Sequence, residues 1–317
     1  QAAIALNRVN GTPGNITERP IDQTDLFQVL DLAQAVSLPV DKDILHTIPQ
    51  DYVIDTLDEI KNPVGMMGRR LEAKVHLVTA ASTAINNLVS SVEELGISVS
   101  GLVFQPIASA LATLEDDEMD LGVTLVDFGA NTTNIAVYYG SSLRHSATIP
   151  IGSASITNDI AVMLQISVSE AEKIKINYAS ALSKMSSDIL EIKYQLNNKS
   201  GEKNITEKEV SQYVEARMQE IFQMIIREIS RADIKDPLTY GIVMTGGGAE
   251  LRNLISLAEN CLNVKVRKGT TLKIEGSEEL ANSTHFATVM GLLLWPFFST
   301  DHVRLNIQSQ VGFKNFL

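Results

Sequence analysis

The spacing of apolar residues changes several times along the chain, and each change predicts a different element. Apolar positions recur every three or four residues over 22–36, which predicts a helix, and alternate over 71–79, which predicts a strand with one buried face. Residues 44–48 and 51–54 are predicted as two short extended segments on either side of Pro49. The first ~80 residues therefore predict a small α+β unit.

Helix and turn signals dominate the stretch that follows. A helix is predicted over 82–95, ending at a glycine, and a short strand over 101–104 precedes a helix over 106–114. The acidic run 115–120 is predicted as a solvated turn, because neighbouring carboxylates repel one another and seek water. These elements lead into a region richer in strands.

Three apolar strands are predicted over 121–128, 135–139 and 143–149. Short polar turns containing glycine join them, and connections of this length join antiparallel neighbours. The pattern predicts a meander rather than a βαβ unit.

Helices dominate the rest of the chain. Two are predicted over 155–164 and 169–178, and the polar stretch 183–204 is interpreted as the tip of a lobe. A long amphipathic helix follows over 206–229, and a strand over 241–244 ends at three glycines.

Composition and charge narrow the function classes. The chain has 317 residues, 44% of them hydrophobic, which is enough for two domains or one two-lobed unit. The formal net charge of −12 gives no general attraction to phosphate backbones, so no nucleic-acid partner is expected. The single cysteine excludes an internal disulfide and a Cys-rich metal site. No stretch reaches the ~20 apolar residues of a membrane-spanning helix, and residues 1–10 lack the pattern of a signal peptide.

The first candidate site is the hairpin Asp-Phe-Gly-Ala-Asn-Thr-Thr-Asn at 127–134. Gly129 lets backbone N–H groups approach an anion, Thr132 and Thr133 add hydroxyl donors, and Asp127 could hold Mg²⁺ through water. The alternative is an ordinary polar hairpin, since Gly, Asn and Thr favour turns.

The second candidate is Thr-Gly-Gly-Gly-Ala at 245–249, between the strand over 241–244 and a helix predicted over 250–260. Glycines at this point let a flat ligand lie against the backbone, and a helix N-terminus offers positive potential. The alternative is a tight turn, although three glycines exceed what a turn requires.

The third candidate is the pair Glu172 and Lys175, which lie three residues apart on one helix face. Together they offer an acceptor and a donor to the hydroxyls of a ribose. The alternatives are a surface ion pair and a capping box formed by Ser169 and Glu172. The five histidines show no metal-ligand spacing, and a Gly-x-Ser-x-Gly motif is absent.

Taken in their order along the chain, the three candidate sites and the helices around them resemble the actin, sugar-kinase and chaperone superfamily of ATP-binding folds. Residues 105–110 resemble its connecting helix and 286–291 its closing helix. Three further blocks resemble the FtsA family of bacterial cell-division proteins more closely: His-Thr-Ile-Pro-Gln-Asp-Tyr at 46–52, Asn-Pro-Val-Gly-Met-Met-Gly-Arg-Arg-Leu-Glu-Ala-Lys-Val-His-Leu-Val-Thr at 62–79, and Leu-Arg-His at 143–145. The resemblance covers nearly the whole chain.

The resemblance implies roles for individual residues, with ATP and Mg²⁺ as cofactors. The resemblance implies that the phosphates of ATP are held by Gly129, Asn131, Thr132 and Thr133. It implies that the ribose is held by Glu172 and Lys175, and the adenosine by Gly246, Gly247, Gly248 and Ala249. Asp127 would hold Mg²⁺ through water, and Gln105 would orient the attacking water. Arg217 would receive the C-terminal tail of the tubulin-like FtsZ.

The fold implied by the resemblance is α/β: an actin-like, two-lobed ATP-binding fold with an inserted α+β subdomain of the SHS2 type. The expected divisions are 1–77 for the inserted subdomain, 78–120 for the rest of the N-terminal lobe, 121–172 with 241–300 for the C-terminal core, 173–240 for a helical outer subdomain, and 301–317 for a linker and the start of a membrane helix.

The resemblance also implies a function. The chain would polymerise, anchor FtsZ filaments to the cytoplasmic face of the membrane at the division site, and meet other division proteins through the inserted subdomain. Membrane contact would be peripheral, through a C-terminal amphipathic helix, and any ATPase activity would be weak. Two alternatives stay open: an FtsA-like protein of pilus assembly, and a small-molecule kinase on the same fold.

Three departures from the family pattern shape these expectations. No Gly-Thr-rich first phosphate loop precedes Gln1, so the first strands of the N-terminal lobe are expected to be missing and nucleotide binding to be weak. Asn134 stands where many relatives have aspartate. The chain stops where Phe313, Phe316 and Leu317 could form the first turn of a membrane helix, so we expect truncation at both ends.

Overall fold

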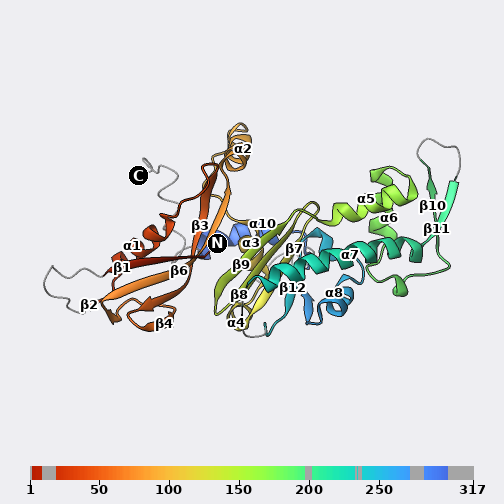
Figure 1. The fold of residues 1–317 in the computed structure, drawn as a ribbon. Coiled ribbons are helices and arrows are strands. Elements are labelled where there is room, and N and C mark those ends of the chain that lie inside the picture. Colours follow the sequence, from red (N-terminus) through yellow and green to blue (C-terminus); the bar gives the residue numbers. More distant parts are fainter. Residues whose placement is uncertain are drawn as a thin grey trace. The chain divides into compact units, whose positions relative to one another are not determined.

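The computed structural model describes residues 2–8, 19–196, 202–232, 234, 238–271 and 282–298. They form two compact units (Figure 1). The first is drawn from Gln1–Phe104 and Trp295–Leu317, and the second is Gln105–Leu294. The finer five-part division expected from the sequence stays a prediction.

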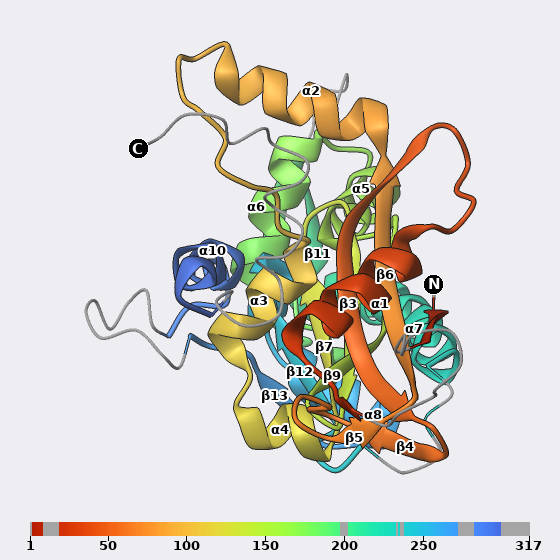
Figure 2. The same cartoon turned by 90° about the vertical axis from the view of Figure 1, so that its left-hand side faces the viewer.

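The first unit is a mixed α+β unit built on a four-stranded antiparallel sheet. The sheet has the order β1-β6-β3-β4, with β1 at Ala2–Arg8, β6 at Arg70–Ala81, β3 at Lys42–Ile54 and β4 at Leu57–Ile60. Helix α1 (Gln23–Gln34) lies across it (Figure 2), and a short pair, β2 (Arg19–Pro20) with β5 (Met67–Gly68), lies beside it. The alternating residues of β6 are buried against α1, as predicted: Leu71, Ala73, Val75 and Leu77.

Two predictions for the first unit are wrong in detail. The segments on either side of Pro49 are one continuous strand, β3, because register shifts beside His46 and Asp51 absorb the irregular pairing with β6. Residues 101–104 form no strand, because the backbone N–H of Phe104 donates to a side chain instead of to a neighbouring strand. Helix α2 (Ser82–Glu93) ends shortly before Gly96, which has a φ of +77°.

The acceptor of that N–H bond is His46, a buried imidazole within the first unit. Its Nε2 accepts from the Phe104 N–H at 2.9 Å, and its ring meets Trp295 edge-on at 5.8 Å between centroids. Burial lowers the pKa of His46 to about 4. The neutral ring with an unprotonated Nε2 is therefore the form that holds the segment before residue 105.

We expect His46 to make stability depend on pH. Because its folded pKa of about 4 lies below the ordinary 6.5, unfolding takes up a proton in that window, and the free energy of unfolding falls as the pH drops through it. The loss should reach about 2 kcal/mol between roughly pH 8 and pH 5. Urea unfolding across this range, compared with His46→Gln, measures it. An equal pH slope in the variant would contradict the prediction.

The second unit is built on a five-stranded sheet of order β13-β12-β7-β8-β9. Strands β7 (Val123–Phe128), β8 (Thr133–Tyr139) and β9 (Ser142–Ile149) form the predicted antiparallel meander. Strands β12 (Ile242–Thr245) and β13 (Val266–Lys268) extend it in parallel with β7.

Helices cover both faces of this sheet. Helix α3 (Gln105–Thr113) packs on one face and α7 (Glu207–Ser230) on the other (Figures 1 and 2). The apolar side of α7 is buried as predicted, with Val210, Val214, Met218, Ile221, Phe222 and Ile225 in the core. Helices α5 (Ser153–Leu164) and α6 (Val168–Tyr178) pack beside α7, α8 (Leu254–Leu262) against β13, and α10 (Ala287–Phe298) follows at the C-terminal side.

Two further elements differ from the sequence interpretation, and a third, the polar stretch, has structure that the sequence interpretation did not specify. The acidic run is helix α4 (Asp116–Leu121), because Glu118 turns inward, is 6% exposed, and pairs with Arg267. The polar stretch contains a turn of 3₁₀ helix at Ser183–Met185 and a hairpin of β10 (Glu191–Gln195) and β11 (Glu202–Thr206). The helix predicted to start at residue 250 starts at Leu254, after a 3₁₀ turn, Gly247–Glu250.

Candidate nucleotide site

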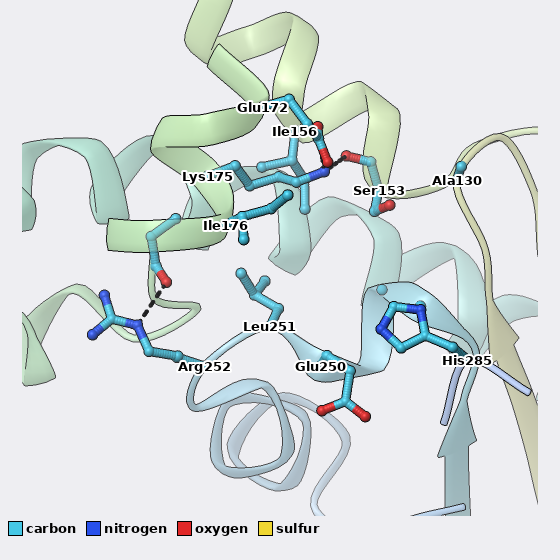
Figure 3. A pocket seen from close by; sticks show the side chains of 13 residues that line it. Ala130, Ser153, Ile156, Glu172, Lys175, Ile176, Glu250, Leu251, Arg252 and His285 are labelled. Atoms are coloured by element: carbon cyan, nitrogen blue, oxygen red, sulfur yellow. Dashed lines mark hydrogen bonds and ion pairs between the residues drawn. The ribbon is translucent and has the colours of Figure 1, made fainter. Parts of the chain in front are cut away.

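A pocket of about 480 Å³ lies within the second unit, among α5, α6, the glycine turn and the segment before α10 (Figure 3). It brings together pieces of all three candidate motifs. Its lining residues are Ala130, Ser153, Ile156, Glu172, Lys175, Ile176, Ala179, Gly247, Gly248, Glu250, Leu251, Arg252 and His285. We call it the α5–α6 pocket.

The hairpin between β7 and β8 forms one wall through Ala130. It is joined to the start of α5, since the N–H groups of Ser153 and Ala154 donate to the carbonyls of Gly129 and Ala130 at 2.9 and 2.8 Å. A Cβ at Gly152 would lie 2.4 Å from the Ala130 carbonyl oxygen, so only glycine permits this approach. The hairpin and the N-terminus of α5 are therefore one rigid wall.

The polar residues of this hairpin differ in their availability. Asn131 is exposed and Thr132 half-buried at the tip. Thr133 is fully buried, and its hydroxyl donates to the Ile151 carbonyl at 2.7 Å. While that bond holds, Thr133 can offer an anion only its backbone. Asn134 is also buried and accepts a hydrogen bond from Thr148.

The predicted pair Glu172 and Lys175 lies on the α6 wall, where Figure 3 shows the two side chains together near Ser153. Lys175 Nζ lies 2.8 Å from Glu172 Oε2 and donates to Thr157 Oγ1 at 2.9 Å, and Thr157 donates to Glu172. The capping role is absent, because Ser167 caps α6. Burial raises the pKa of Glu172, but the bonds from Lys175 and Thr157 lower it by more, and it lies below the ordinary value. The pair presents a carboxylate and an ammonium held in place by Thr157.

The glycine turn forms the opposite wall. Gly246 has a φ of +86°, and a Cβ there would lie 2.6 Å from both Asp127 Oδ1 and the Phe128 carbonyl oxygen. A Cβ at Gly248 would lie 2.3 Å from the Phe128 ring. These two glycines are required by packing, and Ala249 is fully buried. Gly247 also lines the pocket, and the atom nearest to an added Cβ there is His285 Nδ1, in a side chain rather than in the backbone, at 2.9 Å.

Asp127 and Gln105, the two residues expected near the chemistry, contact each other directly. Asp127 Oδ2 accepts from Gln105 Nε2 at 3.0 Å, from Ser109 Oγ at 2.7 Å and from Thr288 Oγ1 at 3.3 Å. The carboxylate is 2% exposed and does not line the pocket. Within the described residues, no group of three His, Cys, Asp or Glu side chains could hold a metal ion. The expected role of Asp127 at Mg²⁺ therefore stays a prediction.

Arg217 lies elsewhere, on α7 at a separate groove of about 290 Å³. The groove is lined by Asn158, Asp159, Val162, Met163, Tyr213, Ala216, Arg217 and Glu220. Arg217 shares this groove with Tyr213, which lies one turn earlier on α7, but its guanidinium is not free. It forms ion pairs with Asp159 and with Glu220. We call this surface the α5–α7 groove.

The sequence interpretation missed four polar residues of the α5–α6 pocket region: Ser153, Thr157, Arg252 and His285. Arg252 donates to the Tyr178 and Ala179 carbonyls and pairs with Glu207, and so ties the glycine turn to α6 and α7. Their local sequence carries no motif, because their position depends on how α5, α6 and the glycine turn meet. Gly152, just before α5, was not singled out from the sequence, although the structure shows that it permits a close backbone approach.

Comparison with protein families agrees with this architecture. The model of the family described as "Cell division protein FtsA" matches residues 124–291, and that of "SHS2 domain inserted in FTSA" matches residues 8–79. The first match covers just over half of the chain and contains the α5–α6 pocket.

Curated relatives carry the same description. The cell division protein FtsA of Pseudomonas aeruginosa is 38% identical over 280 residues, which cover 88% of this chain and 67% of the relative. The FtsA of Neisseria meningitidis serogroup B is 34% identical over 281 residues, covering 88% and 67%. That of Escherichia coli K12 is 34% identical over 285 residues, covering 88% and 68%. The chain thus spans about two thirds of the length of these relatives.

Solved structures share the fold at lower identity. MreB5 of Spiroplasma citri bound to ADP superposes with a TM-score of 0.55 at 17% identity, over 68% of this chain and 65% of that one. The PilM–PilN type IV pilus biogenesis complex gives 0.56 at 18% identity, over 92% and 76%. These likenesses show an actin-like α/β fold, and the family model with relatives at 34–38% identity shows that the chain belongs to the FtsA family of cell-division proteins.

Proposed function

We propose that the chain is the nucleotide-binding part of a division protein that forms filaments and anchors FtsZ at the inner face of the membrane. One observation carries the nucleotide half of the proposal. A single pocket of about 480 Å³, within the usual size of small-ligand sites, is lined by parts of all three motifs expected to meet ATP.

The lining suggests how a nucleotide would lie. The hairpin wall and the N-terminus of α5 would face the phosphates, with Ala130 and Ser153 nearest. Glu172 and Lys175 would meet the ribose hydroxyls, and Ile176 and Leu251, which face each other across the pocket in Figure 3, would sandwich the base. Mg²⁺ would neutralise phosphate charge. Because binding is expected to be weak without a first phosphate loop, calorimetric titration with Mg-ADP up to millimolar concentration tests this, and heats indistinguishable from dilution over that whole range would refute it.

The partner half of the proposal rests on the α5–α7 groove. Val162 and Met163 are 74% and 56% exposed there, beside Tyr213 and the Arg217 guanidinium. A short acidic and apolar peptide, such as an FtsZ tail, would cover these apolar side chains and place a carboxylate at Arg217.

We expect Arg217→Glu to weaken capture of a labelled FtsZ tail by at least ~1 kcal/mol, because it removes the cation and adds a charge that repels the peptide. Fluorescence anisotropy measures the affinity, and circular dichroism checks the fold. Arg227→Glu is the matched control, since Arg227 is exposed on the same helix and does not line the groove. Equal affinities for wild type and Arg217→Glu would move the FtsZ site off this surface.

Filament formation and membrane attachment rest on family membership. The segment expected to begin a membrane helix, 301–317, lies outside the described residues. Among the described helices, none combines the length and apolar character that crossing a bilayer requires. Sedimentation with lipid vesicles, with and without Mg-ATP, tests both properties.

Two alternatives from the sequence can be separated by experiment. A pilus-assembly role has the fold likeness to PilM in its favour, but the FtsA family match favours division. Pull-down with the FtsZ tail distinguishes the two. A small-molecule kinase would require polar groups for a second substrate beside the terminal phosphate, and turnover with a panel of sugars would reveal it.

A further inference from the structure

The guanidinium of Arg217 already holds a carboxylate. Asp159, on α5, accepts from Arg217 Nε at 2.6 Å and from Nη2 at 2.8 Å, which is the two-pronged geometry that arginine adopts with carboxylates. Glu220, on the same helix as Arg217, accepts from Nη1 at 2.6 Å. The hydrogen bond to Asp159 raises the pKa of Arg217, so the guanidinium stays charged at every pH at which the protein is studied.

Charge at this point of the groove is therefore opposite to what an acidic peptide needs. One cation faces two carboxylates, so the local sum is one negative charge. An incoming carboxylate meets repulsion unless one of the two moves away. Asp159 occupies two of the donors that a peptide carboxylate would use in the same geometry.

Asp159 can leave at modest cost. Its side chain and that of Arg217 are each 29% exposed, so neither charge is left without water when the pair opens, and a peptide carboxylate in the same geometry restores the two bonds that Asp159 gives up. The backbone that carries Asp159 is fixed, since α5 is tied to the hairpin by Ser153 and to Glu172 and Lys175 by Thr157. Release is thus a rotation of one side chain.

We propose that Asp159 is a built-in competitor, which occupies the carboxylate-binding face of Arg217 until an acidic peptide displaces it. The inference rests on the proposed role of the groove as a peptide receptor. It makes Asp159 a specificity-determining residue. A peptide succeeds only if it brings a carboxylate to replace Asp159 and apolar side chains to cover Val162 and Met163.

The test compares wild type with Asp159→Asn, which keeps the side-chain shape and one acceptor but removes the charge. By anisotropy, Asp159→Asn should bind the labelled FtsZ tail at least threefold more tightly. A tail in which every Asp and Glu is replaced by Asn and Gln should bind both proteins equally. Glu220→Gln is the matched control: it removes the other carboxylate, which is 58% exposed and uses only Nη1, and should give a smaller gain.

Thermal unfolding accompanies these titrations. Asp159→Asn should lower the melting temperature slightly, so a tighter complex cannot come from a better folded protein. Equal or weaker binding of the acidic tail by Asp159→Asn would overturn the inference and leave the receptor role standing. A gain shared by the neutral tail would also overturn it. No capture by either folded protein would refute the receptor role itself, and the inference with it.

Discussion

Replacing Gly291 with alanine is expected to destabilise the protein by about 3 kcal/mol or more. Within the second unit, α10 touches the backbone of α3 at this glycine. A Cβ there would lie 1.7 Å from the Ala108 carbonyl oxygen and 2.3 Å from its carbonyl carbon. Neither helix can yield without moving a fully buried residue, Ala108, from its place. Urea unfolding monitored by circular dichroism measures the change.

The sign of this effect is diagnostic. In an isolated helix, glycine to alanine stabilises by roughly 1 kcal/mol, so helix propensity predicts the opposite result. Leu293→Ala on the same helix is the control, because Leu293 is 62% exposed and its truncation should change stability by less than ~0.5 kcal/mol. A Gly291→Ala protein as stable as wild type would show that α10 and α3 do not meet as described.

In a protein extended to the full length of the curated relatives, Gly247→Asp should reduce the affinity for Mg-ATP by about a hundredfold, or ~2.7 kcal/mol. Gly247 lines the pocket, and an aspartate there would add a negative charge near the phosphates. The fold should survive, because the nearest atoms that the structure describes around an added Cβ belong to the side chain of His285, which can rotate away. Calorimetry gives the affinity, and a thermal melt confirms folding.

Two control variants separate charge from bulk. Gly247→Ala adds the Cβ without the charge and should cost far less affinity. Asn87→Asp adds the same charge on the exposed side of α2, in the first unit, and should change nothing. Unchanged binding by a folded Gly247→Asp protein would remove the glycine turn from the nucleotide site.

Local periodicity predicted the elements whose burial is set by their own sequence. The β7–β9 meander, the alternation of β6 and the apolar side of α7 are examples, because each repeats a pattern over many residues. Predictions failed where a residue distant in sequence determines the local secondary structure. The acidic run is helical because Glu118 forms an ion pair with Arg267. Residues 101–104 form no strand because the N–H of Phe104 donates to His46.

The candidate site shows the same division. Gly247, Gly248 and the Glu172–Lys175 pair, which line the pocket, were recognisable as candidates because their spacing is visible in the sequence. Thr157 and His285 were not, since each reaches its position through the packing of separate elements. Nor could spacing show that Asp159, remote in sequence, already occupies Arg217.

Helix α5 contributes to two surfaces at once. Ser153 and Ile156 line the α5–α6 pocket, while Val162 and Met163, further along, line the α5–α7 groove. Substitutions in α5 are therefore expected to be pleiotropic, and a division defect caused by one of them does not identify which ligand was lost. Separation-of-function alleles should come from the helices that serve one surface each: α6 for nucleotide, through Lys175, and α7 for the peptide, through Arg217.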